Sequence, residues 1–216
     1  MRKSNPSFVA STLLRAYPDA RCSLLFTSPY ECLIAVMLSA QCTDKKVNQV
    51  TPTLFAKYPD CFALSEASLS DLEALLRPLG LAHSKAKNLK STAETIAQSG
   101  GNVPDDYERL LSLPGVGNKT ARVILMEAFG ESSFPVDTHV ARISKRLGLA
   151  AEYDSPEKIE KRLEKLFPIS KQPKLHHCFI SFGRDICRAS KPLCEGCPLK
   201  DGCRYFAKKS SLTIGK

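Results

Sequence analysis

The chain has 216 residues, of which 43% are hydrophobic, so it is long enough to bury a core and is expected to fold rather than remain disordered. Its formal net charge of +9 favours a polyanionic partner, either nucleic acid or an anionic membrane surface. The longest apolar run, Cys32–Leu38, is far shorter than the roughly eighteen residues that a membrane-spanning helix needs. The N-terminus also lacks the apolar region and cleavage site of a secretory signal, so we expect a cytoplasmic protein with no membrane partner.

Proline and glycine separate segments of helical length along almost the whole chain, and no sustained alternation of period two is present. This pattern predicts an all-α fold. Capping residues mark several expected helix starts, including Thr43 and the Ser155-Pro156-Glu157 string. The expected helices are Tyr30–Gln41, Asp44–Tyr58, a stretch that starts at Ser70 or Asp71 and ends at Pro78–Gly80, Ser84–Ser99, Asp105–Ser112, Asn118–Phe129 and one that begins after Ser155.

A tight turn between two of these helices carries Gly115, Val116 and Gly117. Glycine allows another backbone to come close, and the free N–H groups at the start of the second helix suit a phosphate. A bare Gly-x-Gly favours an ordinary helix–helix turn. The longer string, L-P-G-V-G-N-K-T-A, resembles the helix-hairpin-helix motif, which grips DNA without reading its sequence.

Lys119 follows the turn, in the first turn of the second helix, where cations are disfavoured by the helix dipole. The same field favours the neutral amine, which is the nucleophilic form of lysine. The alternative is a surface lysine that contacts a phosphate, and its position alone favours that alternative. Asp137 precedes another helical stretch and is expected to be its N-cap. The same carboxylate, kept ionised by the capping N–H groups, is suited to face a sugar cation.

The C-terminal part of the chain combines positive charge with closely spaced cysteines. Residues 171–216 hold ten Lys and Arg against three acids, which favours a surface that faces phosphates. Four of the nine cysteines follow the pattern C-x6-C-x2-C-x5-C, which suits tetrahedral zinc or a [4Fe–4S] cluster. The pattern lacks the paired C-x2-C knuckles of most four-cysteine zinc sites, so it slightly favours iron–sulfur. These residues are Cys187, Cys194, Cys197 and Cys203.

Four strings that lie far apart in the chain form one combined pattern. They are Leu113–Ala121, Val136–His139, Ser39–Asp44, and Gly80-Leu81 followed by Ser84–Ala86. Together they resemble the endonuclease III family, and the resemblance runs from about Phe26 to Tyr205. Because it covers most of the chain and combines several motifs, the resemblance is highly specific.

The resemblance implies a bifunctional DNA glycosylase of base excision repair, which removes oxidised pyrimidines and cleaves the 3′ side of abasic sites. Lys119 is then the Schiff-base nucleophile and Asp137 its carboxylate partner. Gln41 is expected to fill the gap left in the duplex and Leu81 to wedge the opposite strand. The implied partner is double-stranded DNA with damaged bases or abasic sites, bound by a monomer at the nucleoid.

The resemblance also implies a two-lobed fold and a [4Fe–4S] cluster on the four cysteines, with a structural and DNA-docking role. One domain is expected to be a helical barrel over residues 21–132, with the helix-hairpin-helix at about 105–129. The other joins residues 1–20 to 133–216 and contains the cluster loop, residues 187–203. Lys119 and Asp137 are expected to meet at the mouth between them.

Two alternatives remain open at this stage. One is a related glycosylase with another base preference, such as mismatched thymine. The other is a helix-hairpin-helix protein that binds DNA without catalysis, against which the Lys119 and Asp137 pair argues. Adenine removal is disfavoured, because the adenine-mismatch relatives carry a glutamate where this chain has Ala35.

Overall fold

The computed structural model describes residues 4–214, with side chains described for residues 4–210. This part of the chain consists of helices and connecting turns and contains no strand, which confirms the predicted all-α class. None of these helices is long and apolar enough to cross a bilayer. The chain divides into two compact units, Cys22–Glu131 and Met1–Arg21 with Ser132–Lys216. We call them the hairpin unit and the terminal unit.

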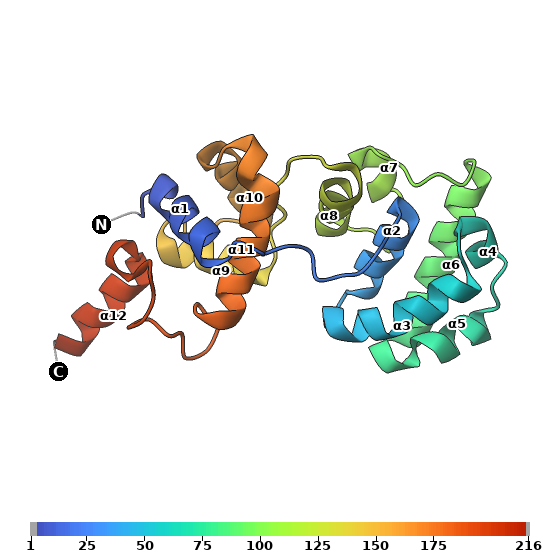
Figure 1. Cartoon of the computed structure of the whole chain (residues 1–216), viewed down its shortest axis with the longest axis horizontal. Coiled ribbons are helices and arrows are strands. Elements are labelled where there is room, and N and C mark those ends of the chain that lie inside the picture. The colour runs from blue at the N-terminus through green and yellow to red at the C-terminus, as the bar shows by residue number, and fades with distance from the viewer. Residues whose placement is uncertain (1–3, 215–216) are drawn as a thin grey trace. The chain divides into compact units, whose positions relative to one another are not determined.

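The hairpin unit is built around helix α2, whose side chains from Tyr30 to Leu38 are nearly all buried except for Glu31. Helix α8 packs on α2, and the long helix α6 packs on α4 and α5 (Figure 1). Its helices are α2 (Pro29–Leu38), α3 (Asp44–Lys57), α4 (Cys61–Ser65), α5 (Leu69–Leu76), the 3₁₀ turn η1 (Arg77–Leu79), α6 (Ala82–Gln98), α7 (Tyr107–Leu111) and α8 (Asn118–Phe129).

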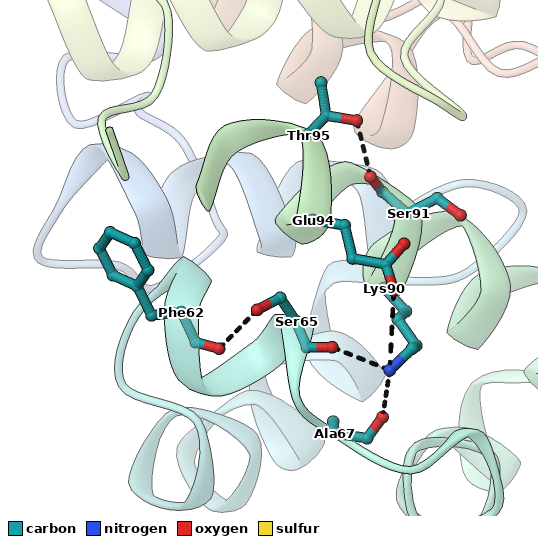
Figure 2. A network of polar contacts seen from close by, with 7 residues as sticks. All are labelled: Phe62, Ser65, Ala67, Lys90, Ser91, Glu94 and Thr95. Atoms are coloured by element: carbon teal, nitrogen blue, oxygen red, sulfur yellow. Dashed lines mark hydrogen bonds and ion pairs between the residues drawn. The ribbon is translucent and has the colours of Figure 1, made fainter. Parts of the chain in front are cut away.

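A half-buried polar contact ties α6 to the end of α4 and the loop that follows it. Figure 2 shows the ammonium of Lys90 on α6 between two backbone carbonyls, those of Ser65 and Ala67, at 2.8 and 2.9 Å. Glu94, one helical turn further on, lies 3.7 Å from the same ammonium. The half-buried charge is therefore surrounded by acceptors, which offsets its loss of hydration.

The terminal unit has a separate core around α11, against which α1 and α9 pack. The rings of Phe134, Phe167 and Phe179 form its centre, with centroids 5.4 to 6.0 Å apart. Such offset and edge-on contacts are the favoured geometries of aromatic pairs. Its helices are α1 (Pro6–Ala16), α9 (Thr138–Leu147), α10 (Pro156–Leu166), η2 (Ile169–Lys171), α11 (Gln172–Asp185), η3 (Lys200–Gly202) and α12 (Arg204–Ile214).

Several expected helix boundaries were wrong by a few residues. The helix expected to end at Gln41 ends at Leu38, because the N–H of Ala40 bonds to the carbonyl of Met37 in a tighter turn. Helix α5 begins at Leu69 rather than at Ser70 or Asp71, since Ser68 Oγ accepts the N–H of Asp71 and caps the helix. Helix α6 begins at Ala82, two residues before the expected start.

Candidate functional site

The turn between α7 and α8 exposes two glycines on either side of a buried anchor. The N–H of Val116 bonds to the carbonyl of Leu113. Its side chain is buried and anchors the turn to the core of the hairpin unit. Gly115 has φ +76° and lies against Asn88, and a Cβ at Gly115 would lie 2.8 Å from Asn88 Nδ2. Gly117 is the N-cap of α8 and is exposed. The backbone at the start of α8 is thus accessible to a phosphate.

Lys119 lies in the first turn of α8, two residues after the Gly117 cap, and its side chain is exposed. The first turn of this helix contains no acidic residue. The amine therefore stands beside the positive end of the helix, as expected from the sequence. Gly117 and Lys119 thus lie two positions apart at an accessible helix N-terminus.

Gln41 and Leu81 are both exposed and both adopt the left-handed backbone conformation, with φ 54° and 51°. This conformation costs an L-residue roughly 1–2 kcal/mol, and residues held in it are concentrated at functional sites. Forty residues apart in sequence, the two side chains line one pocket of about 110 Å³, together with Gly115. Leu81 is 58% exposed, although its sequence context without the family resemblance suggests a core residue.

Asp137 is the N-cap of α9, as the sequence predicts. Its Oδ1 accepts the N–H of Val140 at 2.7 Å, and the side chain is half-buried. Asp137 belongs to the terminal unit, whereas Lys119 belongs to the hairpin unit. Ala35 on α2 is fully buried, and its methyl side chain cannot act as an acid.

The four C-terminal cysteines line a single cavity in the terminal unit: Cys187, Cys194, Cys197 and Cys203. In the part of the chain that the structure describes, no three His, Cys, Asp or Glu side chains form a group suited to one metal ion. Burial raises the pKa of Cys197 and Cys203, and the neighbouring cysteines raise it further. The thiolate forms of these side chains are therefore unfavourable unless a strongly positive group lies between them.

Comparison with known proteins identifies the family. The model of the HhH-GPD superfamily of base excision DNA repair proteins matches residues 34–169, and that of the iron–sulfur binding domain of endonuclease III matches residues 187–203. Endonuclease III of Bacillus subtilis (strain 168) is 43% identical over 201 residues, 93% of this chain and 92% of that protein. The chain belongs to the endonuclease III family.

Two solved structures are similar over almost the whole chain. A trapped endonuclease III–DNA covalent intermediate has a TM-score of 0.90 at 42% identity, with 94% of this chain and 96% of that chain covered. A thermostable thymine-DNA glycosylase has a TM-score of 0.86 at 26% identity, with 94% and 97% covered. As an endonuclease III family member, the chain is a base-excision DNA glycosylase with abasic-site lyase activity, which confirms the predicted function.

The family membership also confirms the predicted [4Fe–4S] cluster. The residues present fit it, because four cysteines distributed around one cavity match a group that takes one thiolate at each iron atom. Arg146 adds a cation at this site: its Nη1 lies 3.5 Å from Cys187 Sγ and its guanidinium lies 4.5 Å from the centre of the Tyr205 ring. A donor beside a ligand sulfur stabilises the thiolate.

A second arginine, Arg142, joins the first turn of α9 to the start of the cluster loop. The sequence pattern did not reveal this contact. Arg142 Nε donates to the carbonyl of Cys187 at 3.0 Å, and its Nη2 donates to the carbonyl of Gly183 and to His139 Nδ1, both at 3.1 Å. Burial lowers the pKa of His139, which keeps the imidazole neutral so that Nδ1 can accept this bond. His139 therefore has a structural role two residues from Asp137.

We expect Gly183→Ala to destabilise the terminal unit, although alanine at a helix interior usually stabilises by up to about 1 kcal/mol. A Cβ at Gly183 would lie 2.5 Å from His139 Nδ1 and 3.1 Å from Arg142 Nη2, so the arginine network must shift. Thermal unfolding measures the effect. Gly196→Ala is the control, because a Cβ there meets nothing within 4 Å. An equal or higher midpoint for Gly183→Ala would contradict the packing argument.

Proposed function

We propose that this chain removes oxidised pyrimidines from double-stranded DNA and then cleaves the 3′ side of the abasic site by β-elimination, acting as a monomer. The observation that carries the proposal is the exposed Lys119 in the first turn of α8. It directly follows the turn of Gly115, Val116 and Gly117, which we call the glycine turn. There a backbone that holds a phosphate and an amine that attacks the adjacent sugar lie two positions apart in the chain. We further propose that it acts on nucleoid DNA in the cytoplasm.

The damaged base first leaves the stack, since its glycosidic bond is out of reach inside the duplex. Gln41 fills the resulting gap and Leu81 wedges the opposite strand, a role supported by their exposure and their shared pocket. As the bond from the base to C1′ breaks, the base departs with the electron pair and positive charge develops on the sugar. The Asp137 carboxylate stabilises that charge.

The neutral amine of Lys119 then attacks C1′, and O4′ takes up a proton as the sugar ring opens to an imine. The imine acidifies the C2′ proton. Loss of that proton forms a carbon–carbon double bond between C2′ and C3′, and the 3′ phosphate leaves with the electrons of its C–O bond. Water hydrolyses the imine and regenerates the amine.

The four cysteines hold the cluster, which orders the loop from Cys187 to Cys203 and presents its cations to DNA. Arg188 and Lys191 are exposed on this loop. Its lysines and arginines bind backbone phosphates, and each such contact adds to the salt dependence of binding. The supporting observation is that charge and cysteines alternate along one short segment.

We expect Cys194→Ser to lose the iron–sulfur absorption and to bind duplex DNA more weakly, with a smaller dependence of affinity on salt. The reason is that a three-cysteine loop no longer holds its cations in place. Cys61→Ser is the matched control, because Cys61 is a buried cysteine on α4 in the hairpin unit, whereas the loop belongs to the terminal unit. Unchanged affinity and fold in Cys194→Ser would contradict a docking role for the cluster.

A panel of otherwise identical duplexes tests the proposed substrate. The duplexes contain thymine glycol, a G·T mismatch, a preformed abasic site or no lesion, and base release is measured separately from strand cleavage. We expect release from thymine glycol and cleavage at the abasic site. Faster release from the mismatch would favour thymine-mismatch specificity, a second candidate supported by the similarity to thymine-DNA glycosylase. Cleavage of none of them would overturn the proposal.

A further inference from the structure

One face of helix α6 joins the left-handed turn at Leu81 to the glycine turn before α8. Leu81, Lys85, Asn88 and Thr92 follow the spacing i, i+4, i+7 and i+11, which places them on one side of a helix. Asn88 lies against Gly115, and Thr92 Oγ1 donates to the carbonyl of Pro114 at 2.7 Å. The far end of this face therefore holds the glycine turn.

Lys85 holds the near end of the same face through two separate bonds. Its backbone N–H donates to the carbonyl of Leu81 at 2.9 Å, and its ammonium donates to the carbonyl of Leu79 at 3.2 Å. The two bonds bracket Gly80, which has φ +71°. Leu81 itself begins α6 as a left-handed N-cap without a side-chain capping bond. The bond from the backbone N–H is the ordinary helix bond, so the ammonium bond to Leu79 is what the lysine side chain itself adds to this turn.

Lys85 is buried in the hairpin unit, where its ammonium donates to the carbonyl of Leu79. Lys85 is 8% exposed and lines the pocket that contains Gln41, Leu81 and Gly115. Burial lowers the pKa of its ammonium, so holding the charge there is unfavourable in itself. An apolar residue of the same length would fill the space without that penalty. Such an apolar residue would not supply a hydrogen-bond donor for the carbonyl of Leu79.

We propose that Lys85 is a positioning residue for Leu81, the wedge. It holds the turn of Leu81 in its left-handed conformation. Through the face of α6 that carries Asn88 and Thr92, it also holds this turn at a set distance from the glycine turn that grips DNA. This inference rests on the wedge role proposed above for Leu81. The helix acts as a rigid spacer, because its residues are fixed by its own hydrogen bonds. Insertion into the duplex then needs no reordering of the turn.

The test uses a duplex with a tetrahydrofuran abasic analogue and 2-aminopurine in the opposite strand, whose fluorescence rises when the base is unstacked. At saturating protein, the wild type gives the full rise. We expect Lys85→Met to reduce the amplitude by at least half and to weaken binding to this duplex about tenfold, the effect of losing one charge-assisted hydrogen bond. Binding to undamaged duplex should stay unchanged.

Lys90→Met is the matched control. It removes a second lysine of α6 that also donates to backbone carbonyls, those of Ser65 and Ala67 (Figure 2). Lys90 lies nine positions after Leu81 in the chain. We expect it to lower the unfolding midpoint while keeping the full fluorescence amplitude. Lys85→Arg, which keeps the donor, is expected to recover most of it. If Lys85→Met does not fold, Lys85→Gln, whose amide is too short to reach Leu79, is expected to show the same loss.

Three outcomes overturn the inference. A full amplitude in Lys85→Met or Lys85→Gln shows that the turn keeps its conformation without the ammonium. An equal loss in Lys90→Met shows a general effect of stability. A third outcome is weaker binding to damaged and undamaged duplex alike, with the slope of log affinity against log salt concentration reduced by about one. That result shows that Lys85 contacts a phosphate directly. Absence of the fluorescence rise in the wild type instead contradicts the wedge role proposed for Leu81, whereas the proposed glycosylase and lyase function is tested separately by base release and strand cleavage.

Discussion

Lys119→Ala is expected to form no covalent adduct when it is mixed with an abasic-site duplex and borohydride, whereas the wild type is trapped on the DNA. Borohydride reduces the imine between a lysine and C1′, so the adduct requires the nucleophilic amine. Cleavage at the abasic site should fall by at least about a hundredfold, the scale on which enzymes lose rate when a covalent nucleophile is removed. Gel electrophoresis of the labelled duplex measures both quantities.

The control for this experiment is Lys158→Ala, which removes another exposed lysine from the first turn of a helix, α10. It should be trapped as well as the wild type. Retained binding to an uncleavable abasic analogue would show that Lys119→Ala still folds and engages DNA. An undiminished adduct in Lys119→Ala would assign the nucleophile to another amine and remove the central step of the proposed mechanism.

Asp137→Asn is expected to slow base release by about 10²–10³-fold, the range found when an electrostatic stabiliser of a transition state is removed. Asparagine still accepts the N–H of Val140 and remains a good N-cap, so the fold of α9 should be preserved. The substitution therefore separates the charge from the cap. Cleavage of a preformed abasic site should be slowed less, because no glycosidic bond has to break there.

Asp60→Asn is the matched control, since Asp60 caps α4 through the same bond to the N–H three residues on, at 2.8 Å. It should leave both activities and the unfolding midpoint near the wild-type values. Single-turnover rates of base release at saturating enzyme give the comparison without a contribution from product release. A rate for Asp137→Asn equal to that of Asp60→Asn would reduce Asp137 to a structural cap.

Local interactions explain which features were predictable from the sequence. The bounds of α8, Asn118–Phe129, agree with the expected range, and Thr43, Ser155 and Asp137 are N-caps as predicted. Each of these depends on residues three or four positions apart, because a capping side chain bonds the backbone of its own first turn. The four cysteines belong to the same class, since their spacing within seventeen residues is itself the signal.

Other features depend on contacts between distant segments, and only the tertiary structure decided them. No local pattern places Gln41, Leu81 and Gly115 around one pocket, because that requires α2, α6 and the glycine turn to pack together. The hydrogen bond from Arg142 to the carbonyl of Cys187, 45 residues away, is of the same kind. The burial of Lys85 was also hidden, since a lysine near a helix start is usually solvated and becomes a buried donor only when neighbouring helices exclude water from it.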